Sequence, residues 1–213
     1  MAVGRVVDEV RTRRPSAEPT RERIVAAAAD LFAERSFAGA TTREIAARAG
    51  VTQPLLNYHF RSKAALWEAA VDSLFEALDA GLASQATEVR DLALLDAARH
   101  QIRAFVVFSA RHPQLHRIIM QESKVDNERM DYLVERHVRP LYDATVALFA
   151  ELVQEGLVAP IAPEHLYYVL TGAGPTMFVL APECRRLTGL DPGSDAVINA
   201  HADAVCTLLF GSW

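Results

Sequence analysis

The spacing of Ala46, Gly50 and Leu56 in the segment AARAGVTQPLLNYHF constrains the fold more than any other feature of the chain. A small residue shortly before a glycine lets two helices pack closely, and the glycine accommodates a left-handed turn between them. An apolar residue shortly after the glycine then packs the second helix against the first. This spacing predicts a helix-turn-helix, that is, two short helices joined by a tight turn.

The second helix of this pair is expected to have one buried face and one exposed face. With Thr52 as its N-cap, Pro54 falls in the first helical turn, where a missing N–H costs no hydrogen bond. At about 100° per residue, Leu56 and Phe60 then face the neighbouring helices. An exposed helix start that carries amide and apolar groups suits the major groove of DNA, because an amide can bridge adenine N6 and N7 and an apolar group can contact a thymine methyl. The expected exposed residues are Gln53, Pro54, Leu55, Asn57 and Tyr58.

The flanking helix starts are candidates for contacts with DNA phosphates. Thr42 is expected to cap the preceding helix and Ser62 the following one, and each helix start directs unpaired N–H groups outward. Arg43 can pair bidentately with a guanine, and Lys63 is one of only two lysines in the chain. A Tyr-His-Phe run on a helix also occurs in an ordinary packed edge, but its combination with the glycine spacing and the local positive charge favours a nucleic-acid interface.

Charge is distributed unevenly along the chain. Residues 1–65 hold 11 of the 22 Lys and Arg residues and 7 of the 27 Asp and Glu residues, so this part carries +4 and the rest −9. A basic head on an acidic body is typical of a small nucleic-acid-binding unit joined to a larger unit, although solvated helix faces also produce such an imbalance. Residues 1–19 are expected to form a flexible basic tail, and an arm that contacts DNA phosphates is the alternative.

Apolar residues recur at helical spacing through the rest of the chain and no alternating strand pattern occurs, so the predicted fold class is all-α. A three-helix head over residues 20–65 is expected to join, through a helix of residues 62–82, a larger body over residues 66–213 for ligand binding and dimerisation. The first helix is expected over about residues 21–36, capped by Thr20 and ended near Gly39. The later helices are expected at residues 92–112, 113–123, 126–155 with a kink at Pro140, 163–181 and 194–210.

The segment TTREIAARAGVTQPLLNYHFRSKAALWEAAV, residues 41–71, resembles the tetracycline-repressor (TetR) family of bacterial transcription regulators. The Thr-Arg helix start, the Gly-Val turn, the aromatic-His-Phe ending and the following Ser-Lys-x-x-Leu occur together in this order, and the resemblance extends back to about residue 20. Beyond residue 85 only the number and lengths of the helices are similar. The resemblance implies a ligand-responsive regulator, most often a repressor, that binds a near-palindromic operator as a homodimer and is released by a small-molecule effector.

The resemblance also implies roles for individual residues. Base contacts are expected from Arg43 and Gln53, and contacts with thymine methyls from Pro54 and Leu55. Asn57 stands where many relatives have a tyrosine, so base preference does not transfer. Contacts with the DNA backbone are expected from Thr42, Tyr58, His59 and Lys63. The complete set of expected DNA-contact residues is Thr42, Arg43, Thr52, Gln53, Pro54, Leu55, Asn57, Tyr58, His59 and Lys63.

Aromatic residues, methionines and a few polar groups in the body suit an apolar or amphipathic small molecule. His112 and His116 also have the spacing of a metal-binding pair on a helix, but Pro113 between them places His112 before the helix. No metal or cofactor is therefore expected. The ligand-binding candidates are Phe105, Phe108, His112, His116, Met120, Tyr142, Met177 and Phe178.

Two apolar stripes near the C-terminus suggest a four-helix interface between two copies of the chain, and ordinary packing within one chain is the alternative. The interface candidates are Leu166, Leu170, Ala173, Met177, Val197, Ala204, Val205 and Leu208.

Several function classes lack support in the sequence. An all-α enzyme and a helical adaptor without DNA binding are the alternative hypotheses, but no His-Glu-x-x-His motif, phosphate-binding loop or cysteine with a fixed partner occurs, so no catalytic residue is expected. No apolar run reaches the roughly 18 residues of a membrane span. Cys184 and Cys206 are expected to be two reduced thiols, and the protein is expected to be cytoplasmic, without a membrane partner.

Overall fold

The computed structural model describes residues 17–89 and 92–211, and these residues form helices and no strand, which confirms the predicted fold class. The first four helices are α1 (Ala17–Gly39), α2 (Thr42–Arg48), α3 (Gln53–His59) and α4 (Lys63–Val89). The body continues with α5 (Leu94–Arg111), α6 (Pro113–Glu122), α7 (Glu128–Leu133), the π-helical turn η1 (Val134–Val138), α8 (Arg139–Gln154), α9 (Pro163–Val179), α10 (Ala181–Thr188) and α11 (Asp195–Phe210).

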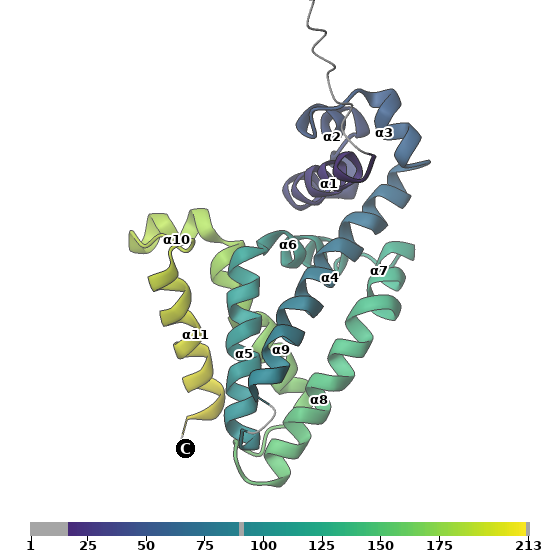
Figure 1. The fold of residues 1–213 in the computed structure, drawn as a ribbon. Coiled ribbons are helices and arrows are strands. Elements are labelled where there is room, and N and C mark those ends of the chain that lie inside the picture. Colours follow the sequence, from purple (N-terminus) through teal and green to yellow (C-terminus); the bar gives the residue numbers. More distant parts are fainter. Residues whose placement is uncertain (1–16, 90–91, 212–213) are drawn as a thin grey trace, which may run out of the picture.

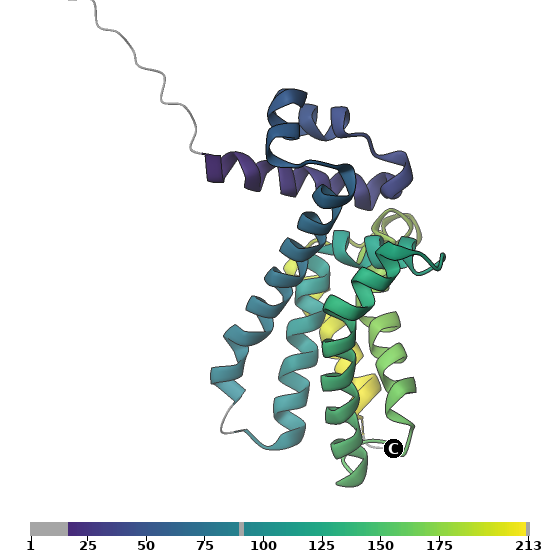
Figure 2. The ribbon, with the colours of Figure 1, turned by 90° about the vertical axis from the view of Figure 1, so that its right-hand side faces the viewer.

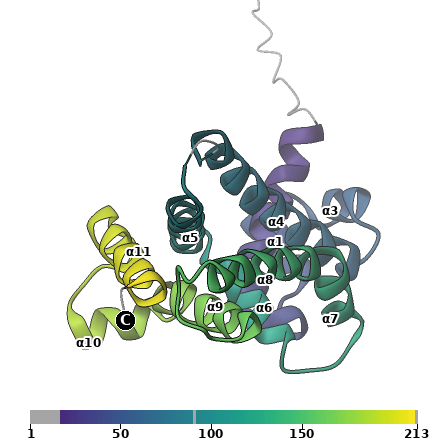
Figure 3. The same cartoon turned by 90° about the horizontal axis from the view of Figure 1, so that it is seen from below.

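Helices α1, α2 and α3 form a head at one end of the molecule, and α4 runs from this head into the body (Figure 1). In the body, the long helices lie roughly side by side, and α1 lies across their upper end (Figure 2). The end-on view places α10 and α11 on the side of the body away from α3 and α7 (Figure 3). The head therefore reaches the body along two routes, through α4 and through the packing of α1 on α6.

Buried apolar side chains form two clusters. The first joins the head to the upper body, because Ile24, Leu56 and Leu66 belong to the same cluster as Leu115 and Leu133. The second fills the space between α5, α8, α9 and α11. One core therefore runs through the junction of head and body, and the two pack directly against each other.

The expected start of the first helix was wrong, and its expected end coincides with a break in the helix. The first helix begins at Ala17, so Thr20 is a buried residue within the helix and not its cap, and residues 17–19 are not part of a tail. Residues 1–16 lie outside the described residues. The helical conformation of α1 is interrupted at Ser36, which has a positive φ of 65°, so the break lies where the end of the first helix was expected. A non-glycine residue in this conformation is held there by its surroundings at a cost of about 1–3 kcal/mol.

The body also differs from the prediction in two places. The expected kink at Pro140 is replaced by the π-helical turn Val134–Val138, and Pro140 occupies the first turn of α8, where its ring is tolerated. The segment after residue 181, expected to be a connection, forms α10. Pro182 starts that helix and Gly189, with φ of 73°, ends it.

Candidate functional site

The turn of the helix-turn-helix is built by backbone hydrogen bonds around Gly50. The N–H of Gly50 donates to the carbonyl of Ala47 at 3.2 Å, and the N–H of Val51 donates to that of Ala46 at 3.0 Å. Gly50 has a φ of 65° with no atom within 4 Å of where a Cβ would be, so the conformation and not space calls for glycine. Ala46 and Leu56 are each only 1% exposed, which confirms that both residues lie inside the predicted motif.

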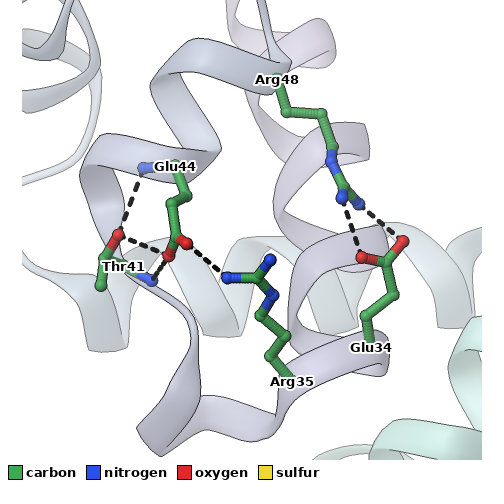
Figure 4. A network of polar contacts seen from close by, with 5 residues as sticks. All are labelled: Glu34, Arg35, Thr41, Glu44 and Arg48. Carbon is green, nitrogen blue, oxygen red and sulfur yellow. Dashed lines mark hydrogen bonds and ion pairs between the residues drawn. The ribbon is translucent and has the colours of Figure 1, made fainter.

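A capping box fixes the start of α2, and it corrects the expected N-cap by one residue. The N-cap is Thr41, whose hydroxyl oxygen accepts from the N–H of Glu44 at 3.2 Å, while the Glu44 carboxylate accepts from the Thr41 N–H at 3.2 Å (Figure 4). The hydroxyl of Thr41 also lowers the pKa of Glu44. Thr42 is consequently the first residue inside the helix.

Two arginines tie α2 to α1. Arg48 donates to both oxygens of Glu34 at 2.7 and 2.8 Å, and Arg35 ion-pairs with Glu44 (Figure 4). The bond from Arg48 lowers the pKa of Glu34. Arg43, between them in sequence, is exposed and has no acceptor among the described residues. Its guanidinium is free for an external partner, whereas those of Arg35 and Arg48 hold the scaffold.

The second helix of the motif presents the face that its periodicity predicts. Thr52 is its N-cap and makes no side-chain cap hydrogen bond, and Pro54 lies in its first turn. Leu56 and Phe60 are buried. Tyr58 is 81% exposed. Its ring lies edge to face with the ring of His59, which is half-buried. The other exposed residues of this face are Thr52, Gln53, Pro54, Leu55 and Asn57.

Lys63 belongs to a small cluster that joins the head to α7. Its Nζ lies 4.6 Å from the centroid of the Phe37 ring, and the Arg129 guanidinium lies 4.2 Å from the same centroid. Arg129 also donates to the buried carboxylate of Glu122 at 2.9 Å. The start of α4 carries a cap as predicted, because the Ser62 hydroxyl accepts from the N–H of Ala65 at 3.0 Å.

The body contains a cavity of about 950 Å³ between α4, α5, α6, η1, α8 and α9. This volume lies near the upper end of the range for small-molecule sites. Of the eight predicted ligand-binding residues, four line it: Phe105, His116, Met120 and Tyr142. The other four, Phe108, His112, Met177 and Phe178, lie outside the lining.

The lining residues that the prediction missed come from elements that meet only in the folded chain. Most are apolar, including Phe75 and Leu78 of α4. Tyr167 and Tyr168 add aromatic groups from α9, and the Tyr142 and Tyr167 rings lie edge to face at 4.8 Å. Burial and the neighbouring Tyr168 and Tyr142 raise the pKa of Tyr167. The pair of adjacent tyrosines at the start of α9 was the sequence signal for this wall.

His116 is the one buried histidine that lines the cavity among the described residues. Burial lowers its pKa to about 4, so it is neutral at pH 7. The Ser109 hydroxyl donates to the Phe105 carbonyl at 2.7 Å, so at 2.9 Å it accepts from Nε2–H of His116. His112 is the N-cap of α6, as Pro113 predicts, and it stacks on Phe108.

A second polar cluster fastens η1 and α7 to α4. The Asp72 carboxylate accepts from the Tyr132 hydroxyl at 2.8 Å, from His137 Nε2 at 2.7 Å and from Arg136 Nε at 3.2 Å. Burial opposes ionisation of Asp72, but these partners outweigh it and lower its pKa. Burial and the bond to Asp72 raise the pKa of Tyr132 to about 12. The His137 ring also stacks on Phe75, which lines the cavity.

Sequence comparison places this arrangement among known proteins. Residues 24–70 match the family described as bacterial regulatory proteins, tetR family, and residues 74–212 match the YcdC-like protein C-terminal region. The HTH-type transcriptional regulator RutR of Escherichia coli (strain K12) is 30% identical over 195 residues, which cover 92% of this chain and 90% of RutR. The chain belongs to the TetR family.

Further proteins resemble it over part of the sequence or in fold. The tetracycline repressor protein class A from transposon 1721 of Escherichia coli is 45% identical over 51 residues, 24% of each chain. The structure of AibR in complex with isovaleryl coenzyme A and operator DNA shares the fold, with a TM-score of 0.66 and 20% identity over 91% of this chain and all of that one. As a TetR-family member, the protein is a DNA-binding transcriptional regulator.

The residues predicted for the interface between two copies divide into two groups in this TetR-family chain. Leu166, Leu170 and Val205 are buried in the core of their own chain, as the alternative hypothesis for these stripes expects. Ala173, Met177 and Val197 are half-buried, while Ala204 and Leu208 are exposed on α11.

The described residues include neither a group of three potential metal ligands nor a helix long and apolar enough to cross a membrane. Both cysteines are free thiols. Burial raises the pKa of the Cys206 thiol, which keeps it in the unreactive protonated form.

Proposed function

We propose that this protein is a cytoplasmic repressor that binds a near-palindromic operator as a homodimer and leaves it when a small amphipathic effector fills the cavity of the body. The observation that carries the proposal is the exposed face of α3, beside Arg43, which has no acceptor among the described residues, on a head whose core continues into the wall of a large cavity. This function requires no catalytic chemistry of the protein.

In the proposed complex, α3 enters the major groove. Gln53 and Arg43 contact base edges. Three further residues lie along the bases: Pro54, Leu55 and Asn57. The other predicted residues contact phosphates, and these are Thr42, Thr52, Tyr58, His59 and Lys63. In a dimer the two copies of α3 would lie about 34–36 Å apart, one turn of DNA. The proposed dimer surface is the exposed side of α11 with Ala204 and Leu208, because the neighbouring Val205 is already used in the core.

The proposed route from effector to DNA runs through η1. This turn contributes Val134 and Val138 to the cavity wall, and it holds α4 through His137 and Asp72. A ligand that displaces η1 would therefore move the helix that carries the head. Such a ligand shifts the equilibrium between two arrangements of the body by the difference in its affinity for them.

Selection of bound duplexes from a random-sequence DNA pool tests the function. We expect a near-palindromic consensus with half-sites one helical turn apart, and sedimentation in solution is expected to show a dimer. Gel shifts on that consensus, repeated with candidate effectors, then test release. Recovery of no enriched sequence, or of sites without two-fold symmetry, would contradict the proposal.

Substitution of Arg43 and of Lys63 is expected to affect DNA binding in different ways. Arg43→Ala should weaken binding to the selected site by about 1–3 kcal/mol and relax preference at one base pair, because a bidentate base contact is lost. Lys63→Ala should weaken binding to all sequences alike and reduce the slope of log K against log salt by about one, because a phosphate contact is lost. Fluorescence anisotropy over a salt series measures both.

The two variants are each other's control. If Arg43→Ala weakens binding to every sequence equally, or if Lys63→Ala leaves the salt slope unchanged, the corresponding assignment is wrong.

Removal of the Asp72 carboxylate is expected to loosen η1 from α4. Asp72→Ala should lower the free energy of unfolding by about 2 kcal/mol, because the hydroxyl, imidazole and guanidinium that it accepts from lose their common acceptor. Asp79→Ala, an exposed position on the same helix, is the matched control and should change it by less than about 0.5 kcal/mol. Equal urea midpoints for the two variants would show that the cluster does not hold η1.

A further inference from the structure

The charge of the cavity lining differs from that of the body around it. Residues 66–213 carry −9, yet none of the residues that line the cavity is Asp or Glu. Two of them, Lys124 and Arg139, are cations. His116 adds no charge at neutral pH, because its buried ring has a pKa of about 4. The lining is therefore apolar with a positive charge that no lining carboxylate balances.

Arg139 is distinguished from the other arginines of the described body. Within residues 92–211, each of the eight others bonds to a carboxylate or a backbone carbonyl, as Arg103 does to Asp203 and Arg117 to the carbonyl of Val179. Arg139 has no such acceptor among the described residues. Since its side chain lines the cavity and is also exposed, it lies where the cavity opens.

Tyrosine side chains of α8 and α9 line the same cavity as this arginine. Tyr142 follows Arg139 by one turn of α8, so the two side chains share a face of the helix, and both line the cavity. The Tyr142 ring lies against that of Tyr167. The pKa of Tyr167 is raised by burial, so its hydroxyl keeps its proton and can donate to an anion.

We propose that the effector is an amphipathic organic anion, whose apolar part fills the cavity and whose carboxylate or phosphate head group is bound by Arg139, with Tyr142 beside it. A guanidinium matches either head group bidentately, and a planar pair of hydrogen bonds is stronger and more specific than the point charge of a lysine. Lys124, in the connection after α6, supplies the second positive charge of the lining and not the head-group contact. This inference rests on the proposed function, because it names the ligand of the same cavity.

Four probes that share one decyl chain test the charge preference. They are decanoate, decyl phosphate, 1-decanol and decyltrimethylammonium, and isothermal titration calorimetry of the full chain without DNA gives their affinities. We expect one or both anions to bind at least about tenfold more tightly than the alcohol, and the cation to bind most weakly, because a charge-assisted hydrogen bond contributes at least that much. The tighter anion identifies the head group.

Variants of the two cations locate the head group. Arg139→Gln should lower the affinity of the preferred anion by about tenfold and leave that of decanol unchanged, while Arg139→Lys should restore part of the loss. Lys124→Gln should have a smaller effect. Arg185→Gln, which removes an arginine of α10 paired with Asp191 outside the cavity lining, is the control and should have none.

The inference would be overturned if neither anion binds more tightly than the alcohol, if none of the four probes binds, or if Lys124→Gln has a larger effect than Arg139→Gln. Because calorimetry is performed without DNA, each of these outcomes is independent of the selection experiment. Failure of the selection with tight anion binding would instead count against the proposed DNA-binding function.

Discussion

Leu56→Ala is expected to lower the free energy of unfolding by about 2–5 kcal/mol and to abolish sequence-specific DNA binding. Leu56 is 1% exposed in the cluster that joins the head to the upper body, and its truncation leaves a cavity between the two helices of the motif. Without this contact, α3 loses its fixed position on α2. Urea unfolding followed by circular dichroism gives the stability, and anisotropy with the selected site gives the binding.

The adjacent residue provides the matched control, because Leu55 is a leucine on the same helix that is 39% exposed. Leu55→Ala should cost at most about 1 kcal/mol of stability, as is usual for surface positions. It should nevertheless weaken binding to the selected site, because the proposed thymine contact is lost. Loss of stability in Leu55→Ala, with Leu56→Ala unaffected, would reverse the orientation of α3 described above.

The stability of the protein is expected to fall by about 3 kcal/mol between pH 6.5 and pH 4 because of His116 alone. Burial lowers the pKa of His116 from an ordinary 6.5 to about 4, and one pH unit of difference in pKa corresponds to about 1.4 kcal/mol. In this window the unfolded chain binds a proton that the folded chain does not, so unfolding becomes easier as the pH decreases. Above about pH 7.5 the histidine is almost entirely neutral in both states and contributes no pH dependence.

Urea unfolding over pH 4–8 measures this effect, and His116→Gln should remove most of the slope while retaining an N–H donor for Ser109. His112 leaves a residual slope in the same direction, because burial also lowers its pKa. His165→Gln is the control, since that side chain is exposed on α9. A His116→Gln profile as steep as that of the parent would show that the His116 ring is accessible to protons in the fold.

The head was predictable from sequence because its determinants are local. Ala46, Gly50 and Leu56 act within a dozen residues, and their spacing specifies both the turn and the buried face. The sequence also contains the capping box, as Thr41 followed three positions later by Glu44, although the predicted N-cap was the adjacent Thr42. Thr41 and Thr42 are adjacent residues of the same type, so residue type alone does not show which hydroxyl faces the end of the helix.

The cavity was only partly predictable because its walls come from distant segments. Residue type correctly identified Phe105 and Tyr142 as lining residues. Phe108 and Phe178 are also aromatic, but they are buried outside the lining. The α10 helix was not predicted because it has only eight residues, too few for a periodic pattern to be recognised, and none of them is buried. The π-helical turn has no periodicity signal of its own, and its Asp72 partner lies more than 60 residues earlier.

In the proposed function the Phe37 ring couples the two ligands, because Lys63, a predicted phosphate contact, and Arg129 of α7 lie against the same ring. A DNA phosphate that draws Lys63 away from the Phe37 ring would leave Arg129 as the one cation of this pair on the ring. A shift of α7, which carries Arg129, would in turn change the position of the ring against which Lys63 packs. If effector weakens DNA binding by a given factor, thermodynamic reciprocity requires that bound DNA weakens effector binding by the same factor. The protein bound to its operator then has a lower affinity for effector than the free protein. Protein that is not bound to DNA would thus bind the first effector molecules in the cell. Protein bound to an operator would be released only after the free protein is saturated with effector.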